Sequence, residues 1–287
     1  MSWRSPARHT LRIFHPFPSA LDAAATAALA AVAGGAPARV ASLAGAMFLI
    51  QASIGTWNDI VDSAVDSTAG RSEKPLGSGL ISRRAAGLLA CGAGAAGLAT
   101  AAMAGPAALV VASLGYGCGL VYDLALKRTA WSWLPFALGI PLLPVFAWVG
   151  AQGNVPGRLW LLVGMAVPAG AALAISNALA DSVADERGGI VTVATRLGWF
   201  RALGVVAVLE ITVGAVALVT ASVGDSGRGA GGAIAIAIAA AGSLVIASGF
   251  AVSALRPHSR SGWAIQAIGF TILAGGWAMA AGGGGAA

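Results

Sequence analysis

The sequence predicts an all-α protein, a polytopic membrane bundle of about nine transmembrane helices in a single domain over residues 1–287. Two observations support this prediction. Hydrophobic residues make up 57% of the chain and charged residues only 10%, whereas soluble proteins average about 25% charged residues. Apolar runs near the roughly 20 residues needed to cross a bilayer also recur from one end of the chain to the other. A soluble globular protein is therefore excluded.

Nine apolar runs, each bounded by polar or charged residues, are the predicted spans. The first run follows three arginines and resembles a signal peptide, but the next run follows at once, so we expect an uncleaved helix. Glycine and alanine are frequent in the runs, and such small residues let helix backbones approach closely in lipid. The runs cover residues 19–34, 39–58, 84–104, 106–123, 131–150, 158–180, 199–222, 230–254 and 262–281.

The distribution of Lys and Arg predicts how the helices are oriented. With nine spans and a cytoplasmic N-terminus, 14 basic residues fall on the cytoplasmic side and 3, Arg39, Arg158 and Arg228, fall outside. This is the asymmetry of the positive-inside rule. We expect an integral protein of a bacterial-type inner (plasma) membrane. Because the basic residues form no Lys/Arg run, we expect membrane lipid as a partner and no nucleic acid.

The acidic residues are concentrated in two short windows on the predicted cytoplasmic side. Of the 11 acidic residues, seven lie there: Asp59, Asp62, Asp66 and Glu73 in the first window, and Asp181, Asp185 and Glu186 in the second. Spacings of three and four residues place the aspartates of each window along one face of a helix. Like charges stacked in this way repel each other, so they require a compensating cation. We expect the two windows to form a cytoplasmic-side active-site cap.

Oxygen-rich side chains of this kind suit Mg²⁺, which is typically held by one or two carboxylates together with substrate phosphate. Two acidic stripes facing each other fit a metal-bound diphosphate. Arg71, Lys74, Lys127 and Arg128 lie on the same side; they are either further contacts to the phosphates or ordinary positive-inside anchors. The remaining basic residues near the spans, Arg83, Arg84, Arg256 and Arg260, are interpreted as anchors.

Three segments together resemble the signatures of the UbiA superfamily of intramembrane prenyltransferases. The first is Asn58-Asp59-x-x-Asp62-x-x-x-Asp66, continuing to Arg71 and Lys74-Pro75-Leu76. The second is Tyr122-x-x-x-x-Lys127-Arg128, and the third is Asp181-x-x-x-Asp185 with Arg187-Gly188. The resemblance extends over the whole chain and includes the number of helices.

This resemblance implies an Mg²⁺-dependent enzyme that ionises an isoprenyl diphosphate and transfers the prenyl group to a small or lipid-like acceptor. It implies catalytic roles for Asp62, Asp66, Asp181, Asp185 and Tyr122. The implied metal ligands are Asp59, Asp62, Asp66, Asp181 and Asp185. The implied diphosphate-binding residues are Asn58, Arg71, Lys74, Lys127 and Arg128.

Two other functions stay open at this stage. Some superfamily members are terpene cyclases, in which the carbocation of a C15–C20 diphosphate is captured by the substrate's own double bonds, and the strongly apolar spans would suit that reaction. The third hypothesis is a non-enzymatic transporter, although transporter ion sites usually lie near the bilayer midplane. The sequence indicates neither the acceptor nor the oligomeric state. Arg12 and His15 are the early candidates for acceptor binding.

Glu210 is an ionisable residue inside the seventh predicted span. An ionisable group at membrane depth is a functional hypothesis by default. The alternatives are a protonated packing residue and a hydrogen bond between helices.

Overall fold

The computed structural model describes residues 12–68, 76–77, 79–223, 229–257 and 259–282, with backbone alone at 64–68 and 282. All regular structure in these ranges is helical. The first half comprises η1 (Arg12–Phe14), α2 (Pro16–Val32), α3 (Pro37–Thr68), α4 (Arg83–Ala102), α5 (Pro106–Val121), η2 (Tyr122–Leu126), α6 (Leu134–Gly139) and α7 (Leu142–Gln152). The second comprises η3 (Gly157–Leu159), α8 (Trp160–Arg187), α9 (Val193–Leu197), α10 (Trp199–Ser222), α11 (Ala230–Leu255) and α12 (Arg260–Gly282).

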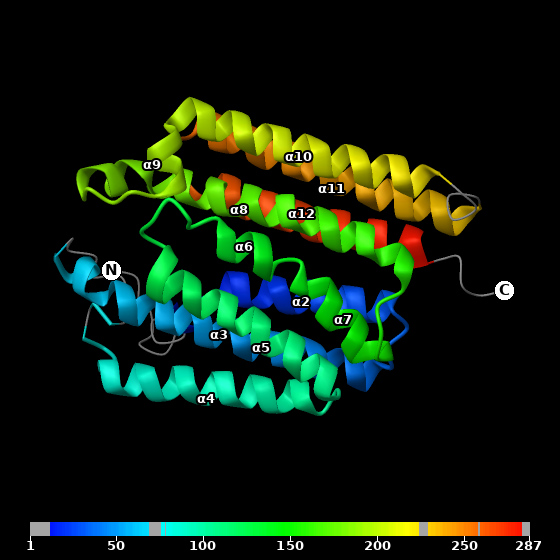
Figure 1. The fold of residues 1–287 in the computed structure, drawn as a ribbon, viewed down its shortest axis with the longest axis horizontal. Helices are drawn as coiled ribbons and strands as arrows, with labels where there is room; N and C mark the ends of the chain where they lie inside the picture. The colour runs from blue at the N-terminus through cyan, green and yellow to red at the C-terminus, as the bar shows by residue number, and fades with distance from the viewer. Residues whose placement is uncertain (1–11, 69–75, 78, 224–228, 258, 283–287) are drawn as a thin grey trace, which may run out of the picture.

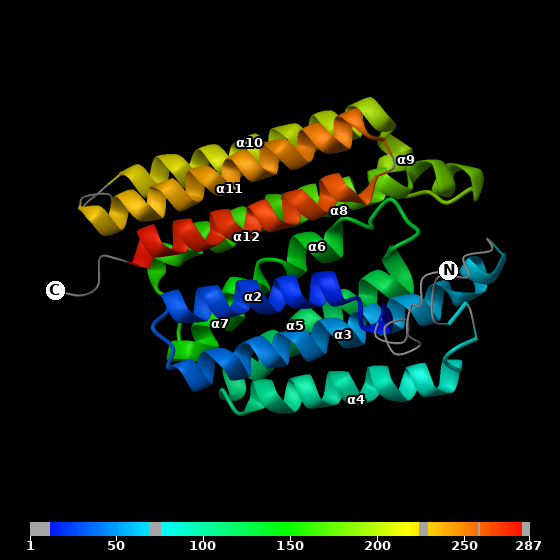
Figure 2. The same cartoon turned by 180° about the vertical axis from the view of Figure 1, so that it is seen from behind.

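The long helices run side by side along one axis and form an elongated bundle (Figure 1). Helices α2 to α7 make one half, and α8, α10, α11 and α12 make the other. The halves meet where α12 packs on α2 and where α6 packs on α8. Figure 2 shows α2 and α12 next to each other on the side away from the viewer of Figure 1. One continuous apolar core joins residues from both halves.

The described residues confirm an all-α membrane bundle. Eight helical segments are long and apolar enough to cross a bilayer, and each overlaps a predicted run. The remaining run, the first in the sequence, corresponds to α2, which at 17 residues is apolar but shorter than the other eight. The second run extends further than predicted, because α3 continues to Thr68 and carries the first aspartate motif on the same helix.

The run at residues 131–150 is broken rather than continuous. Helix α6 ends at Gly139, and α7 begins at Leu142, directly after Pro141. Proline has no backbone N–H to donate, and its ring clashes with the preceding turn, so it interrupts a helix. The two short helices together cross the apolar region as one interrupted span.

Glycines bring α11 and α12 into close contact. A Cβ atom added at Gly242 would lie 2.4 Å from the backbone nitrogen of Leu273, and one added at Gly269 would lie 2.6 Å from that of Ile246. Both distances are shorter than van der Waals contact. The two helix backbones therefore approach each other through their glycines, as expected for helices packed in lipid.

We expect Gly269→Leu to destabilise the protein strongly, because the new side chain must push α11 and α12 apart. Overpacking a well-packed interior costs about 1–3 kcal/mol or more. The matched control is Gly275→Leu on the same helix, where an added Cβ meets nothing within 4 Å. Thermal unfolding in detergent should show a clear loss of Tm for the first variant and little change for the second. Equal Tm values for the two variants would contradict this packing.

Candidate active site

Charged and polar side chains gather at one end of the bundle, which we call the polar end and define by the C-terminal end of α3 and the N-terminal end of α4. There Arg83 of α4 donates from Nη1 to the Ser63 Oγ at 3.0 Å. The ends of α5, α8 and α11 and the starts of α10 and α12 lie at this same end (Figure 1). At the opposite end, Arg39 donates to the Met103 carbonyl at 2.9 Å.

The predicted sidedness of the basic residues is reproduced by this arrangement. Arg39 and Arg158 belong to the elements at the opposite end. The other described basic residues belong to elements or connections at the polar end: Arg12, Arg83, Arg84, Lys127, Arg128, Arg187, Arg196, Arg201, Arg256 and Arg260. These ten residues are far apart in the sequence, and the alternating direction of successive helices accounts for their common location.

Asp62 of the first motif is held by two cations. Lys127 Nζ lies 2.5 Å from its Oδ2, and Arg128 Nη2 lies 3.1 Å from its Oδ1. The Asp62 side chain is 16% exposed, so these ion pairs are less screened by water than pairs on an open surface. Lys127 and Arg128 therefore lie beside the first motif, and their binding of the diphosphate stays a prediction.

Asn58 lies one helical turn before Asp62 and contacts the segment that precedes Lys127. Its Nδ2 donates to Oδ1 of Asp123 at 2.7 Å, and Asp123 is buried. Because Asn58 and Asp62 are four residues apart, they lie on one face of α3, and that face is turned toward η2 and Lys127. Asp123 stands within the Tyr-x-x-x-x-Lys-Arg segment, but no signature marks it as a site residue.

Asp59 faces a different neighbour from Asp62. Its Oδ1 lies 3.2 Å from Nε2 of His15, directly after η1, and Asp59 is 2% exposed. His15 has a φ of 45°, a left-handed conformation rare for a non-glycine residue. A Cβ on Gly55 would lie 2.8 Å from His15, so glycine is required for this approach. The aspartates of the first motif thus contact two separate elements, where the spacing had predicted one shared stripe.

The segment that meets α3 is a π-helical turn. The N–H of Lys127, directly after η2, donates to the Tyr122 carbonyl at 2.8 Å, a bond that spans five residues instead of four. Such π-turns are rare and are often found at functional sites. Tyr122 packs edge-on against Phe136, with ring centroids 5.1 Å apart. The turn therefore links α5 to the first aspartate motif.

The second motif is paired with a cation from α12. Arg260 Nη2 lies 2.6 Å from Oδ2 of Asp181, near the end of α8. Arg260 is also close enough to Asp62 to interact with it electrostatically, and Tyr122 lies near both Asp62 and Asp181. The two motifs therefore converge on one site. Arg260 was interpreted as an anchor, and the structure adds an ion pair between its guanidinium and a motif carboxylate that the sequence did not predict.

The other predicted site residues are described by the structure only in part. Asp185, one turn beyond Asp181, is partly exposed at the polar end. The Asp66 side chain, Arg71 and Lys74 lie outside the described residues. Within the part of the chain that is described, no three His, Cys, Asp or Glu side chains are close enough to hold a metal by themselves. Mg²⁺ needs only one or two carboxylates when phosphate oxygens complete its shell, so the donor set still fits it.

Glu210 does not belong to the group of motif residues and cations at the polar end. It is 6% exposed, and within the described residues its Oε1 has no hydrogen-bond partner. It lies 11 residues after Trp199, the first residue of α10, which corresponds to about 17 Å along the helix. The structure therefore places Glu210 in the middle of the bundle, away from the aspartates.

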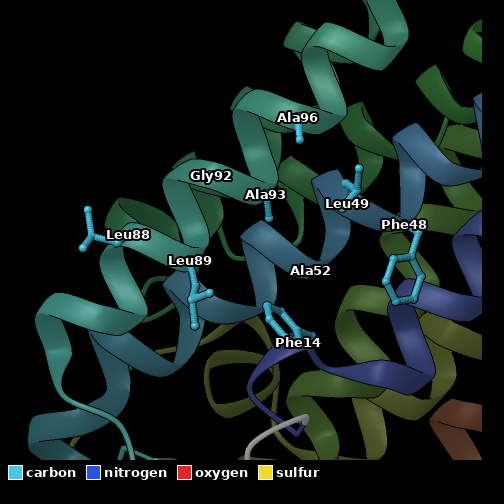
Figure 3. A pocket seen from close by; sticks show the side chains of 9 residues that line it. All are labelled: Phe14, Phe48, Leu49, Ala52, Leu88, Leu89, Gly92, Ala93 and Ala96. Carbon is cyan, nitrogen blue, oxygen red and sulfur yellow. The ribbon is translucent and has the colours of Figure 1, made fainter.

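An apolar groove of about 420 Å³ runs along α3 and α4 beside Phe14 (Figure 3). No charged side chain lines it, so it offers nothing that could bind a diphosphate. Its open side exposes aliphatic and aromatic side chains, which suits contact with hydrocarbon. The lining residues are Phe14, Phe48, Leu49, Ala52, Leu88, Leu89, Gly92, Ala93 and Ala96.

Solved structures with a similar fold include two UbiA homologues and digeranylgeranylglyceryl phosphate synthase. An apo UbiA homologue from Aeropyrum pernix K1 superposes with a TM-score of 0.72 at 22% identity, covering 90% of this chain and 96% of that one. An Archaeoglobus fulgidus UbiA homologue bound to GPP and Mg²⁺ gives 0.68 at 18%, with coverages of 92% and 99%. A structure of digeranylgeranylglyceryl phosphate synthase gives 0.67 at 16%, with 95% and 96%. At these identities the likeness shows the fold.

Comparison with curated protein sequences gave no significant match. The sequence profile of the UbiA prenyltransferase family, in contrast, matches residues 21–265. That range runs from α2 to the start of α12 and includes both aspartate motifs and the π-turn between them. The chain belongs to the UbiA prenyltransferase family.

Proposed function

We propose that this protein is an Mg²⁺-dependent prenyltransferase that takes an isoprenyl diphosphate and transfers the prenyl group to a small or lipid-like acceptor. The observation that carries the proposal is the convergence of Asp62 and Asp181, from α3 and α8, at one end of an apolar bundle with cations beside them. This combination of carboxylates, cations and a dry interior suits a substrate with a charged head and a long hydrocarbon tail.

In this proposal Asp62 and Asp181 hold the metal, together with Asp59, Asp66 and Asp185. Bound Mg²⁺ would neutralise the charge that develops on the leaving diphosphate. The A. fulgidus homologue with GPP and Mg²⁺ supports this assignment by its fold.

The basic side chains bind the diphosphate and stabilise it as it leaves. Lys127 and Arg128, which are paired with Asp62 in the structure, and Arg260, which is paired with Asp181, present N–H donors at the polar end. Donors of this kind make stronger hydrogen bonds to an anionic oxygen than to a neutral one. Charge that grows on the leaving group is therefore stabilised more than the charge of the bound substrate.

The walls of the site protect the prenyl cation. Tyr122, directly before Asp123, packs against Phe136, and aromatic faces of this kind attract cations. The surrounding helices supply Ala, Leu, Val and Phe side chains, which contain no nucleophile and exclude water. We further propose that the polar end faces the cytoplasm, because it carries the excess of Lys and Arg.

The decisive experiment incubates the purified protein with Mg²⁺ and C10, C15 and C20 prenyl diphosphates, first without any acceptor and then with membrane lipid extract. We expect the diphosphate to stay intact in the first reaction and to be consumed in the second, with a prenylated product detected by mass spectrometry. EDTA should stop consumption. A cyclic hydrocarbon or alcohol formed without acceptor would show a terpene cyclase instead. Uptake into liposomes without any product would overturn both enzymatic functions.

A further inference from the structure

A buried carboxylate outside the aspartate motifs contacts the first motif. Asp123 is 3% exposed and lies in the π-turn η2. Its Oδ1 accepts the hydrogen bond from Asn58 Nδ2 at 2.7 Å. Its Oδ2 is buried and makes no hydrogen bond within the described residues. Burying a carboxylate in this way is costly, so its retention in the site calls for a functional reason.

We infer that Asp123 is a positioning residue that fixes the orientation of the Asn58 carboxamide in the metal-diphosphate site. The inference rests on the proposed function. An asparagine side chain has a donating end and an accepting end, and a carboxylate can only accept. Asp123 therefore holds the NH₂ group of Asn58 and turns its carbonyl oxygen away from η2. That oxygen is the only atom of the Asn58 side chain that can bind Mg²⁺, since Mg²⁺ takes oxygen ligands.

The register of the π-turn makes this contact part of a paired arrangement. Asn58 and Asp62 are one turn apart on α3, and their partners Asp123 and Lys127 are four residues apart along η2. The bond from Lys127 N–H to the Tyr122 carbonyl closes the π-turn between these partners. The same turn therefore positions both polar residues of α3, one through a carboxylate and the other through an ammonium group.

Residues that orient a metal ligand without touching the metal typically change metal affinity by 10–100-fold when they are mutated. A residue that only packs would change stability and leave metal affinity unaltered. Metal affinity therefore separates a positioning role from a purely structural one.

The test measures binding of Mn²⁺, a paramagnetic substitute for Mg²⁺, to the full-length protein in detergent with inorganic diphosphate, by electron paramagnetic resonance of free Mn²⁺. We expect Asp123→Leu to weaken Mn²⁺ binding by about 10–100-fold and Asp123→Asn, which can still accept from Asn58, to weaken it less. The control is Ser132→Ala, a buried polar residue whose Oγ has no hydrogen bond in the described part of the chain. It should bind Mn²⁺ like the wild type.

A second measurement covers the case in which Asp123→Leu does not fold. Asn58→Ala removes the ligand that Asp123 is inferred to orient, so adding Asp123→Asn to it should cause no further loss of Mn²⁺ affinity. Independent, additive losses would overturn the inference, as would wild-type affinity in a folded Asp123→Leu protein. Wild-type protein that binds no Mn²⁺ with diphosphate would contradict the proposed function itself, which distinguishes the two failures.

Discussion

Replacing Asp62 with alanine is expected to abolish measurable turnover of prenyl diphosphate while the protein remains folded and extractable. Asp62 is the carboxylate of the first motif that contacts both Lys127 and Arg128, and it lies within electrostatic reach of Arg260. Its loss removes a proposed metal ligand and leaves two cations without their partner. Removing one group that stabilises transition-state charge typically lowers kcat by about 10²–10³-fold, and here the metal site is lost as well.

The comparison for Asp62→Ala is Glu186→Ala, which removes an exposed carboxylate at the same polar end. Glu186→Ala should keep turnover close to that of the wild type. Diphosphate release and prenyl product should both be followed at saturating substrate, with Tm measured for each variant. Full activity of Asp62→Ala would refute the assignment of α3 to the site.

Under the proposed function, replacing Arg260 with glutamine is expected to lower kcat by about 10²-fold, because the variant loses the charged donor that pairs with Asp181 and is proposed to bind the leaving diphosphate. The effect should appear in kcat as well as in KM, since the stabilised charge grows in the transition state. Arg260→Lys keeps the charge but not the two-pronged geometry, so it should restore only part of the rate.

Arg256→Gln supplies the matched control for Arg260. Arg256 is an exposed arginine directly after α11 at the same end of the bundle. Steady-state kinetics with a single prenyl diphosphate should show near wild-type values for it. A similar loss in both arginine variants would mean that general surface charge, and not a directed contact, accounts for the effect.

Hydropathy predicted the spans of this protein well because the cost of placing a charge in hydrocarbon is large and local. The same pattern predicted which loops share one end, since successive helices alternate in direction. It did not predict the break at Pro141. An apolar run records hydrophobicity, and the loss of one backbone donor inside that run does not change its hydropathy.

The contacts of the site were less predictable, because they depend on how each helix is rotated about its axis. Asp62 and Lys127 are 65 residues apart in the sequence, and they meet only because α3 packs on η2. Asp59 is three residues from Asp62 but is turned toward His15 instead. The contact of Arg260 with Asp181 was not predicted, because in the sequence a charge at a helix start looks the same as that of an anchor.

The length of α3 has a consequence for how the two products would leave. Its 32 residues correspond to about 48 Å, whereas the hydrocarbon layer is about 30 Å thick. We expect this surplus to bring the end of the helix, with Asn58 and Asp62 near it, toward the aqueous boundary. Under the proposed function, inorganic diphosphate would pass directly into water while the prenylated product stays dissolved in lipid. The phase boundary itself would separate the products and disfavour the reverse reaction.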